Sequence, residues 1–225
     1  MGLFRPIIGK GLTITPEGIE PSDRMLTPAN AMTAARPVLA IAAANRLLKG
    51  QRPVTPIVFF MGASDAEGNV ARFISKIAPN SGLGVSTFGE EFDPVADTAA
   101  ILFVGSACLR APRMPVTAKL AVATALGHEG FKAAWALRTN HDYQRLSGER
   151  LKIKPTIEGK ESMAEKLSAI GMAVLASDFD HPIVRQTLSA GALGFATVGS
   201  LRAERQRDIY NTQAMQMMAD YAQDA

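Results

Sequence analysis

The chain has 225 residues, of which 47% are hydrophobic and 20% charged. This is the composition of an ordinary globular protein and excludes disordered, collagen-like and low-complexity chains. A single cysteine excludes a disulfide framework within the chain, and three scattered histidines cannot complete a Cys/His zinc site. The net charge of +3 is too small to indicate a nucleic-acid-binding protein, so we expect no nucleic-acid partner.

Residues 1–25 form the first predicted element, an N-terminal arm. Three prolines and several glycines lie in this stretch, which predicts at most a short helix. The first ten residues carry Arg5 and Lys10 around only a short apolar stretch, so the sequence does not predict a cleavable signal peptide.

Apolar segments of helical length follow the arm. The longest run without a charged residue, 186–201, is shorter than the 18 residues by which a transmembrane helix is usually recognised, and a strict criterion therefore predicts a soluble, alanine-rich helical protein. If each segment is allowed one to three ionisable residues, the sequence predicts instead an all-α integral membrane bundle of six transmembrane helices with a short N-terminal arm. These segments are residues 26–48, 53–75, 86–109, 115–138, 161–179 and 183–202.

Lysine and arginine are distributed unevenly between these segments. They are concentrated in the N-terminal arm, in residues 72–85 and 138–160 and near the tail, whereas the opposite connections hold few. This bias is expected of a multi-pass cell-membrane protein whose two termini face the cytoplasm. We therefore predict a cytoplasmic arm at 1–25, a membrane domain at 26–202 and a cytoplasmic tail at 203–225.

Two acidic stretches carry the candidate chemistry, and the second of them is the more regular. On a helix, Gly89, Asp93 and Asp97 share one face because they are spaced four residues apart. Two carboxylates one turn apart can hold a divalent cation, and ligation by oxygen alone suits Mg²⁺ or Mn²⁺. The structural alternative is that Asp93 caps a helix that begins at Pro94.

The first acidic stretch offers a second face. Asp65, Gly68 and Arg72 are spaced i, i+3 and i+7, and two packed helices would gather several carboxylates around one point. Gly68 and Gly89 would permit the close approach of a backbone or a ligand. The chemistry that this pattern implies is at phosphorus.

These residues resemble the signature of the CDP-alcohol phosphatidyltransferase family, which reads D-x-x-D-G-x-x-A-R, a spacer and G-x-x-x-D-x-x-x-D. The second half is matched by Gly89, Asp93 and Asp97. The first half is matched at Gly68, Ala71 and Arg72. The order of residues 92–97 is typical of phosphatidylglycerophosphate synthase-like members.

A further match lies in the first predicted segment. Asn30, Thr33 and Arg36 repeat the N-x-x-T-x-x-R pattern with which many members of the family open. The resemblance covers about residues 26–202.

The resemblance implies an enzyme of phospholipid biosynthesis that transfers a phosphatidyl group from CDP-diacylglycerol to a small alcohol and releases CMP. It implies Mg²⁺ or Mn²⁺ as cofactor, an active site that faces the cytoplasm, contact with membrane lipids, and a homodimer. By this resemblance, the metal ligands are Asp65, Glu67, Asp93 and Asp97. Asp97 would also take the proton of the acceptor hydroxyl, and binding of the CDP moiety falls to Gly68, Ala71, Arg72 and Gly89.

The acceptor and the activity leave alternatives open. Gly159-Lys160 and the basic residues of 138–160 favour glycerol 3-phosphate, with inositol phosphate or another alcohol as alternatives. Ser64 and Glu67 stand where the family has aspartates, and the spacer at 73–88 is longer than the family's. A catalytically degenerate membrane protein of the same fold and a soluble helical interaction protein are therefore the competing interpretations.

Overall fold

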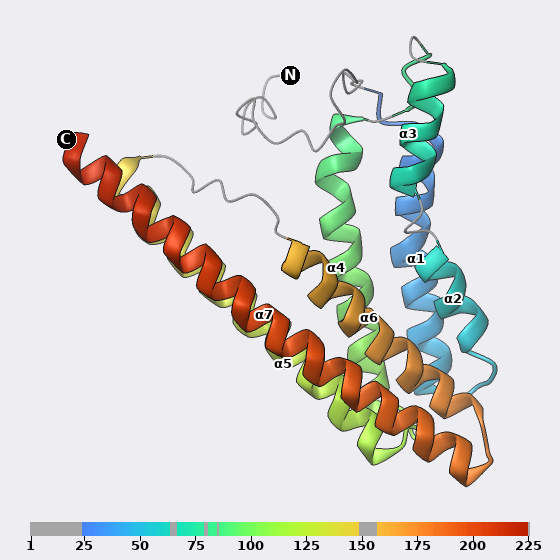
Figure 1. The fold of residues 1–225 in the computed structure, drawn as a ribbon. Coiled ribbons are helices and arrows are strands. Elements are labelled where there is room, and N and C mark those ends of the chain that lie inside the picture. Colours follow the sequence, from blue (N-terminus) through green and yellow to red (C-terminus); the bar gives the residue numbers. More distant parts are fainter. Residues whose placement is uncertain (1–23, 64–66, 79–80, 85, 149–156, 225) are drawn as a thin grey trace.

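The computed structural model describes residues 24–63, 67–78, 81–84, 86–148 and 157–224, and these form seven α-helices (Figure 1). The helices are α1 (Pro28–Leu48), α2 (Thr55–Ala63), α3 (Glu67–Ile77), α4 (Thr87–Arg110), α5 (Val116–Ser147), α6 (Ile157–Asp178) and α7 (Pro182–Asp224). The structure is all-α, with seven helices where the sequence predicted six.

The helix ends follow the local sequence. Thr27 caps α1 by accepting a hydrogen bond from the amide of Asn30 (3.1 Å), with Pro28 at the first helical position. Ser86 caps α4 in the same way, through the amide of Gly89 (3.1 Å). Helix α5 ends at Gly148, whose φ of 73° is a left-handed conformation that glycine adopts without steric cost.

Several helix bounds differ from those predicted from the sequence. Helix α4 begins at Thr87, so Asp93 lies within the helix, and the structural alternative in which Asp93 caps it is wrong. The predicted segment 53–75 is divided into α2 and α3, of nine and 11 residues. Helix α7 runs through the predicted start of the tail at residue 203.

The prediction of a membrane bundle is wrong. Among the described helices, none combines the length and the apolar character that a bilayer crossing requires. Helices α2 and α3 are too short, and the longer helices contain many alanines and several ionisable residues, so their mean hydropathy stays low. The six-span fold and the multi-pass cell-membrane localisation, with the termini and active site facing the cytoplasm, are both overturned by this finding.

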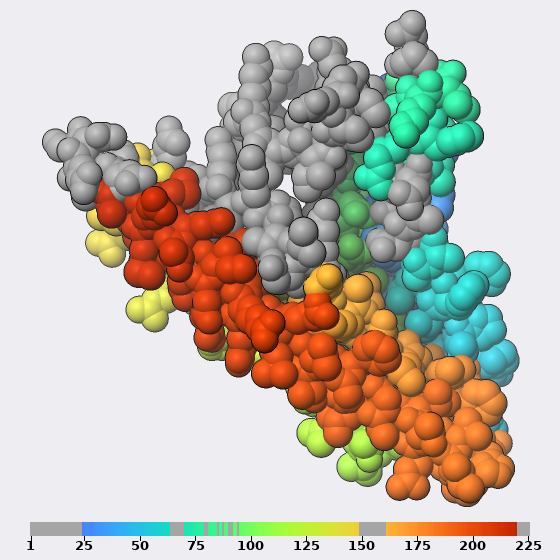
Figure 2. Space-filling model, in the orientation of Figure 1, coloured from blue at the N-terminus to red at the C-terminus, as the bar shows by residue number. Residues whose placement is uncertain are grey.

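The helices pack as two groups joined through α4 and α6. Helix α1 lies along α4, with α2 and α3 beside α1, whereas α5 and α6 both lie along α7 (Figure 1). The long helices α5 and α7 run parallel, with His128 near Glu204 and Trp135 stacked on Tyr210, and the pair continues beyond the start of α6 (Figure 1). The space-filling view shows α6 and α7 as one continuous surface, with α2 next to the C-terminal end of α6 (Figure 2).

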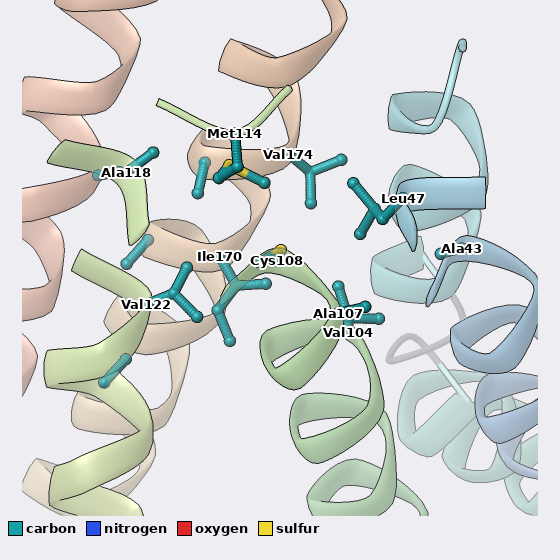
Figure 3. Close-up of a cluster of buried hydrophobic side chains, with 14 of the residues drawn as sticks. Ala43, Leu47, Val104, Ala107, Cys108, Met114, Ala118, Val122, Ile170 and Val174 are labelled. Atoms are coloured by element: carbon teal, nitrogen blue, oxygen red, sulfur yellow. The ribbon is translucent and has the colours of Figure 1, made fainter. Parts of the chain in front are cut away.

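The core is built mainly from small side chains. Figure 3 shows Ala43 and Leu47 of α1 facing Val104 and Ala107 of α4, with Ile170 of α6 nearby. Alanine lets helix backbones approach closely, and burial of its methyl group still removes apolar surface from water. Burial raises the pKa of the Cys108 thiol in this core to about 12, so this side chain serves as a packing residue.

Candidate functional site

The candidate site lies where the N-terminal half of α1 meets that of α4. Asn30 of α1 donates a hydrogen bond through its side-chain amide to Ser86 Oγ (2.9 Å) and another to the carbonyl of Met25 (2.8 Å). Since Ser86 is the cap of α4, this amide joins the starts of the two helices. Gly89 lies against the same amide, where a Cβ would clash with Asn30 Oδ1.

Thr33 lies one turn further along α1. Its side chain is 1% exposed, and its hydroxyl donates to the carbonyl of Ala29 within the helix (3.3 Å). The hydroxyl is therefore satisfied locally, and Thr33 contributes packing between α1 and its neighbours.

Arg36, the next residue of the same face, binds both acidic residues of α4. Its Nη1 atom donates to Asp93 Oδ1 (2.9 Å) and also to Asp97 Oδ1. The Arg36 side chain is 4% exposed, whereas those of Asp93 and Asp97 are 35% and 21% exposed. Two carboxylate oxygens thus converge on one nitrogen atom, at a place where the carboxylates remain in contact with solvent.

The first half of the family motif is placed only in part. Ala71 is buried and Arg72 is exposed on α3, which packs against α1. Glu67 and Gly68 belong to the first turn of α3, but their side chains lie outside the described residues, as do Ser64 and Asp65 altogether. The structure therefore brings Asn30, Thr33, Arg36, Gly89, Asp93 and Asp97 together along one helix pair.

The predicted four-carboxylate metal set can be compared with the structure at two positions, Asp93 and Asp97. Among the side chains that the structure describes, no three histidine, cysteine, aspartate or glutamate residues gather where they could hold one metal ion. The two placed carboxylates nevertheless match the ligand type that Mg²⁺ and Mn²⁺ prefer, because such ions often use one or two carboxylates together with water and phosphate oxygens.

A second polar cluster, between α5, α6 and α7, is not predicted from the sequence. Lys166 of α6, whose side chain is 0% exposed, donates to Glu129 Oε1 of α5 (2.6 Å), and Lys132 also binds Glu129 (2.9 Å). Burial opposes ionisation of Glu129, but the hydrogen bonds and charges of Lys166 and Lys132 outweigh it and lower its pKa. Burial lowers the pKa of Lys166, with Glu129 acting in the opposite direction.

The residues of this cluster are paired with one another rather than arranged around an open site. On the next turns, Arg202 of α7 binds both Glu161 and Glu165 of α6. His128 lies 3.9 Å from Glu204 of α7. The only signal in the sequence was the adjacent pair His128-Glu129, and the structure directs Glu129 to Lys166.

A third polar cluster lies at the end of the bundle away from the candidate site, where it joins the end of α6 to the start of α2. Asp178, at the end of α6, accepts hydrogen bonds from the amides of Val54 (2.8 Å) and Thr55 (2.7 Å) at the start of α2. Arg52 and Arg113 both bind the exposed Asp180. These contacts join the connections between α1 and α2, between α4 and α5, and between α6 and α7. The spacing of the sequence does not indicate them, because the partners are more than 60 residues apart.

Comparison with known proteins gives no assignment: no family model, curated protein or solved structure matches this chain. The functional interpretation therefore depends on the α1–α4 geometry and on the resemblance of its residues to the family signature.

Proposed function

We propose that the chain transfers a phosphatidyl group from CDP-diacylglycerol to a small alcohol and releases CMP, with Mg²⁺ or Mn²⁺ as cofactor. One observation carries the proposal: the Oδ1 atoms of Asp93 and Asp97 converge on a single nitrogen of Arg36. The residues of the two motifs, N-x-x-T-x-x-R and G-x-x-x-D-x-x-x-D, meet at this helix pair although they are more than 50 residues apart.

The donor set fits the proposed cofactor. Asp93 and Asp97 offer hard oxygen ligands, and their partial exposure leaves room for water and for the phosphate oxygens of a substrate. Asp65 and Glu67 are the further ligands that the resemblance implies. Charge neutralisation at the diphosphate, as the bond to CMP breaks, is the chemistry that the metal ion supplies when bound.

The side chains of α1 and α4 would accept the proton and position the reacting groups. The acceptor oxygen attacks the phosphorus of the phosphatidyl group, the bond from that phosphorus to CMP breaks, and Asp97 takes the proton of the acceptor hydroxyl. Asn30 fixes the start of α4 through Ser86 and so positions both aspartates. The space beside Gly89 is filled by the Asn30 amide, and Ala71 is buried, so binding of the CDP moiety by these two residues rests on the resemblance alone.

Glycerol 3-phosphate is our first choice of acceptor, on the basis of the basic stretch 138–160. Arg138 and Arg145 of this stretch are exposed on α5 and available to an anion, although Arg138 also lies 4.0 Å from Asp142. Inositol phosphate and unphosphorylated alcohols are the alternatives in the same reaction class.

The test is an assay of CMP release from CDP-diacylglycerol in detergent mixed micelles. It compares Mg²⁺, Mn²⁺ and EDTA and uses a panel of acceptors headed by glycerol 3-phosphate. Metal-dependent release with one acceptor would establish the reaction and the substrate together. Absence of release with every acceptor, from protein shown to be folded by circular dichroism, would favour the catalytically degenerate alternative suggested by Ser64 and Glu67.

A further inference from the structure

Arg36 is the positive group that binds both carboxylates of the proposed site. Its guanidinium reaches from α1 to α4 and lies between two carboxylates that are one helical turn apart. The side chain is almost fully buried, at 4% exposure, whereas both aspartates keep contact with solvent. Solvent therefore reaches both carboxylates while the guanidinium that they bind is buried.

The charges explain why the guanidinium lies there. Like charges four residues apart on a helix repel each other, and one guanidinium between Asp93 and Asp97 relieves this repulsion. The group of three still carries one net negative charge, so a divalent cation is attracted to it more strongly than a monovalent one.

Arg36 and a divalent cation compete for the same two carboxylates. The Nη1 atom of Arg36 already donates to Oδ1 of both aspartates, and it lies 2.9 Å from that of Asp93. A divalent cation held by these carboxylates would lie close to the guanidinium, and the two positive charges would repel each other. Binding of the ion therefore favours withdrawal of the guanidinium.

We infer that Arg36 is a displaceable counter-cation. It holds Asp93 and Asp97 in place while no metal is bound, and it competes with the metal ion for the same two carboxylates, so that it sets the affinity of the site for divalent cations. The inference rests on the proposed function in one respect, namely that these two aspartates are metal ligands. Arg36 acts here as a positioning residue that also limits metal binding.

Mn²⁺ binding, measured by electron paramagnetic resonance of the free ion, tests the inference without any assay of activity. Arg36→Gln removes the competing charge and should lower the dissociation constant for Mn²⁺ by about tenfold. Arg36→Lys keeps one charge but loses the planar fork that lets arginine hold two carboxylates, and its affinity should lie between the two. Equal or weaker binding by both variants would overturn the inference.

Two controls identify the site that is measured. The double variant Asp93→Asn/Asp97→Asn should lose the site, both alone and together with Arg36→Gln. Arg202→Gln removes a matched arginine, which holds Glu161 and Glu165 on neighbouring turns of α6, and should leave the Mn²⁺ affinity of the Asp93/Asp97 site unchanged.

The outcomes separate this inference from the proposed function. If Arg36→Gln does not fold, as judged by circular dichroism, tighter binding by Arg36→Lys supports the inference and unchanged or weaker binding overturns it. Tighter binding by the Arg36 variants without CMP release from the wild type would support the competition and remove the proposed reaction. Mn²⁺ binding at the aspartates that does not respond to Arg36 would overturn the competition alone, and no binding by any variant would overturn both.

Discussion

Gly89 shows how closely α1 and α4 approach each other at the candidate site. A Cβ at this position would clash with Asn30 Oδ1 and would lie 3.1 Å from Ser86 Oγ, and neither side chain is free to move because the two bind each other. We predict that Gly89→Ala lowers the free energy of unfolding by about 1–3 kcal/mol through overpacking. Urea denaturation measures this value.

Gly127 is the matched control for this substitution. It also lies within a helix, α5, but a Cβ there would have no atom within 4 Å. Gly127→Ala should therefore leave the stability unchanged or raise it by about 0.5–1 kcal/mol, because alanine favours helix. Equal effects of the two substitutions would show that the contact with Asn30 is not close.

Asp178 and Asp180 are two residues apart but have different roles. Asp178 accepts two amide hydrogen bonds and the hydroxyl hydrogen bond of Thr55 (2.7 Å) at the start of α2, whereas Asp180 is an exposed partner of two arginines. We predict that Asp178→Ala lowers the free energy of unfolding by about 1–2 kcal/mol, as the loss of a helix cap does. Asp180→Ala should cause no measurable change in the same urea titration, since ion pairs in solvent contribute little. A larger loss for Asp180→Ala would reverse this assignment.

At the level of the helices, the ion pair between Lys166 and Glu129 joins α6 to α5. Because Lys166 is buried, its removal leaves a carboxylate that is largely shielded from water and without its main partner. We predict that Lys166→Met lowers the free energy of unfolding by about 3–5 kcal/mol, measured by urea denaturation.

The double variant Lys166→Met/Glu129→Leu separates loss of the pair from loss of packing. Since it leaves no buried charge, it should recover most of the stability that Lys166→Met loses. If the double variant is as unstable as the single one, the helices depend on the packing of the lysine stem rather than on its charge.

The sequence predicts where most helices lie, but it does not predict whether lipid or other helices surround them. Helix α4 runs over Thr87–Arg110 where 86–109 was predicted, since its apolar residues and flanking polar residues are read locally. The membrane prediction is wrong because apolar alanine-rich segments also form the interfaces of a helical bundle. Ionisable residues within such segments can be paired across helices, as Lys166 and Glu129 are, and no spacing rule connects partners 37 residues apart.

The candidate site is predictable to the same limited extent. Helical spacing places Asp93 with Asp97, and Asn30 with Thr33 and Arg36, on two faces. The two faces meet because α1 packs on α4, and this packing also lets Arg36 bind both aspartates. The sequence alone does not specify which helices pack together. The homodimer, the metal cofactor and the CDP-linked substrate remain predictions.

For the whole molecule, His128 links stability to pH. Burial and the positive charges of Lys166 and Arg207 lower the pKa of His128 below its ordinary value of 6.5, against the opposing charges of Glu204 and Glu129. The unfolded chain therefore binds this proton more tightly than the folded chain, and stability decreases as the pH falls below about 6.5.

We predict that His128→Gln makes the free energy of unfolding less dependent on pH between about 5 and 7. Urea titrations at several pH values measure this slope. His141→Gln is the control, since His141 is 69% exposed on the same helix, and it should leave the slope as in the wild type. An unchanged slope in His128→Gln would assign the acid sensitivity to other groups.

CMP release by Asp97→Asn tests the central claim most directly. The substitution keeps the size of the side chain but removes the charge that would hold the metal ion and take the proton. With CDP-diacylglycerol, Mg²⁺ and the best acceptor, we predict a fall in rate of at least about 100-fold, whereas Asp208→Asn, at an exposed site on α7, should keep the wild-type rate. A wild-type rate in Asp97→Asn would contradict the assignment of this site.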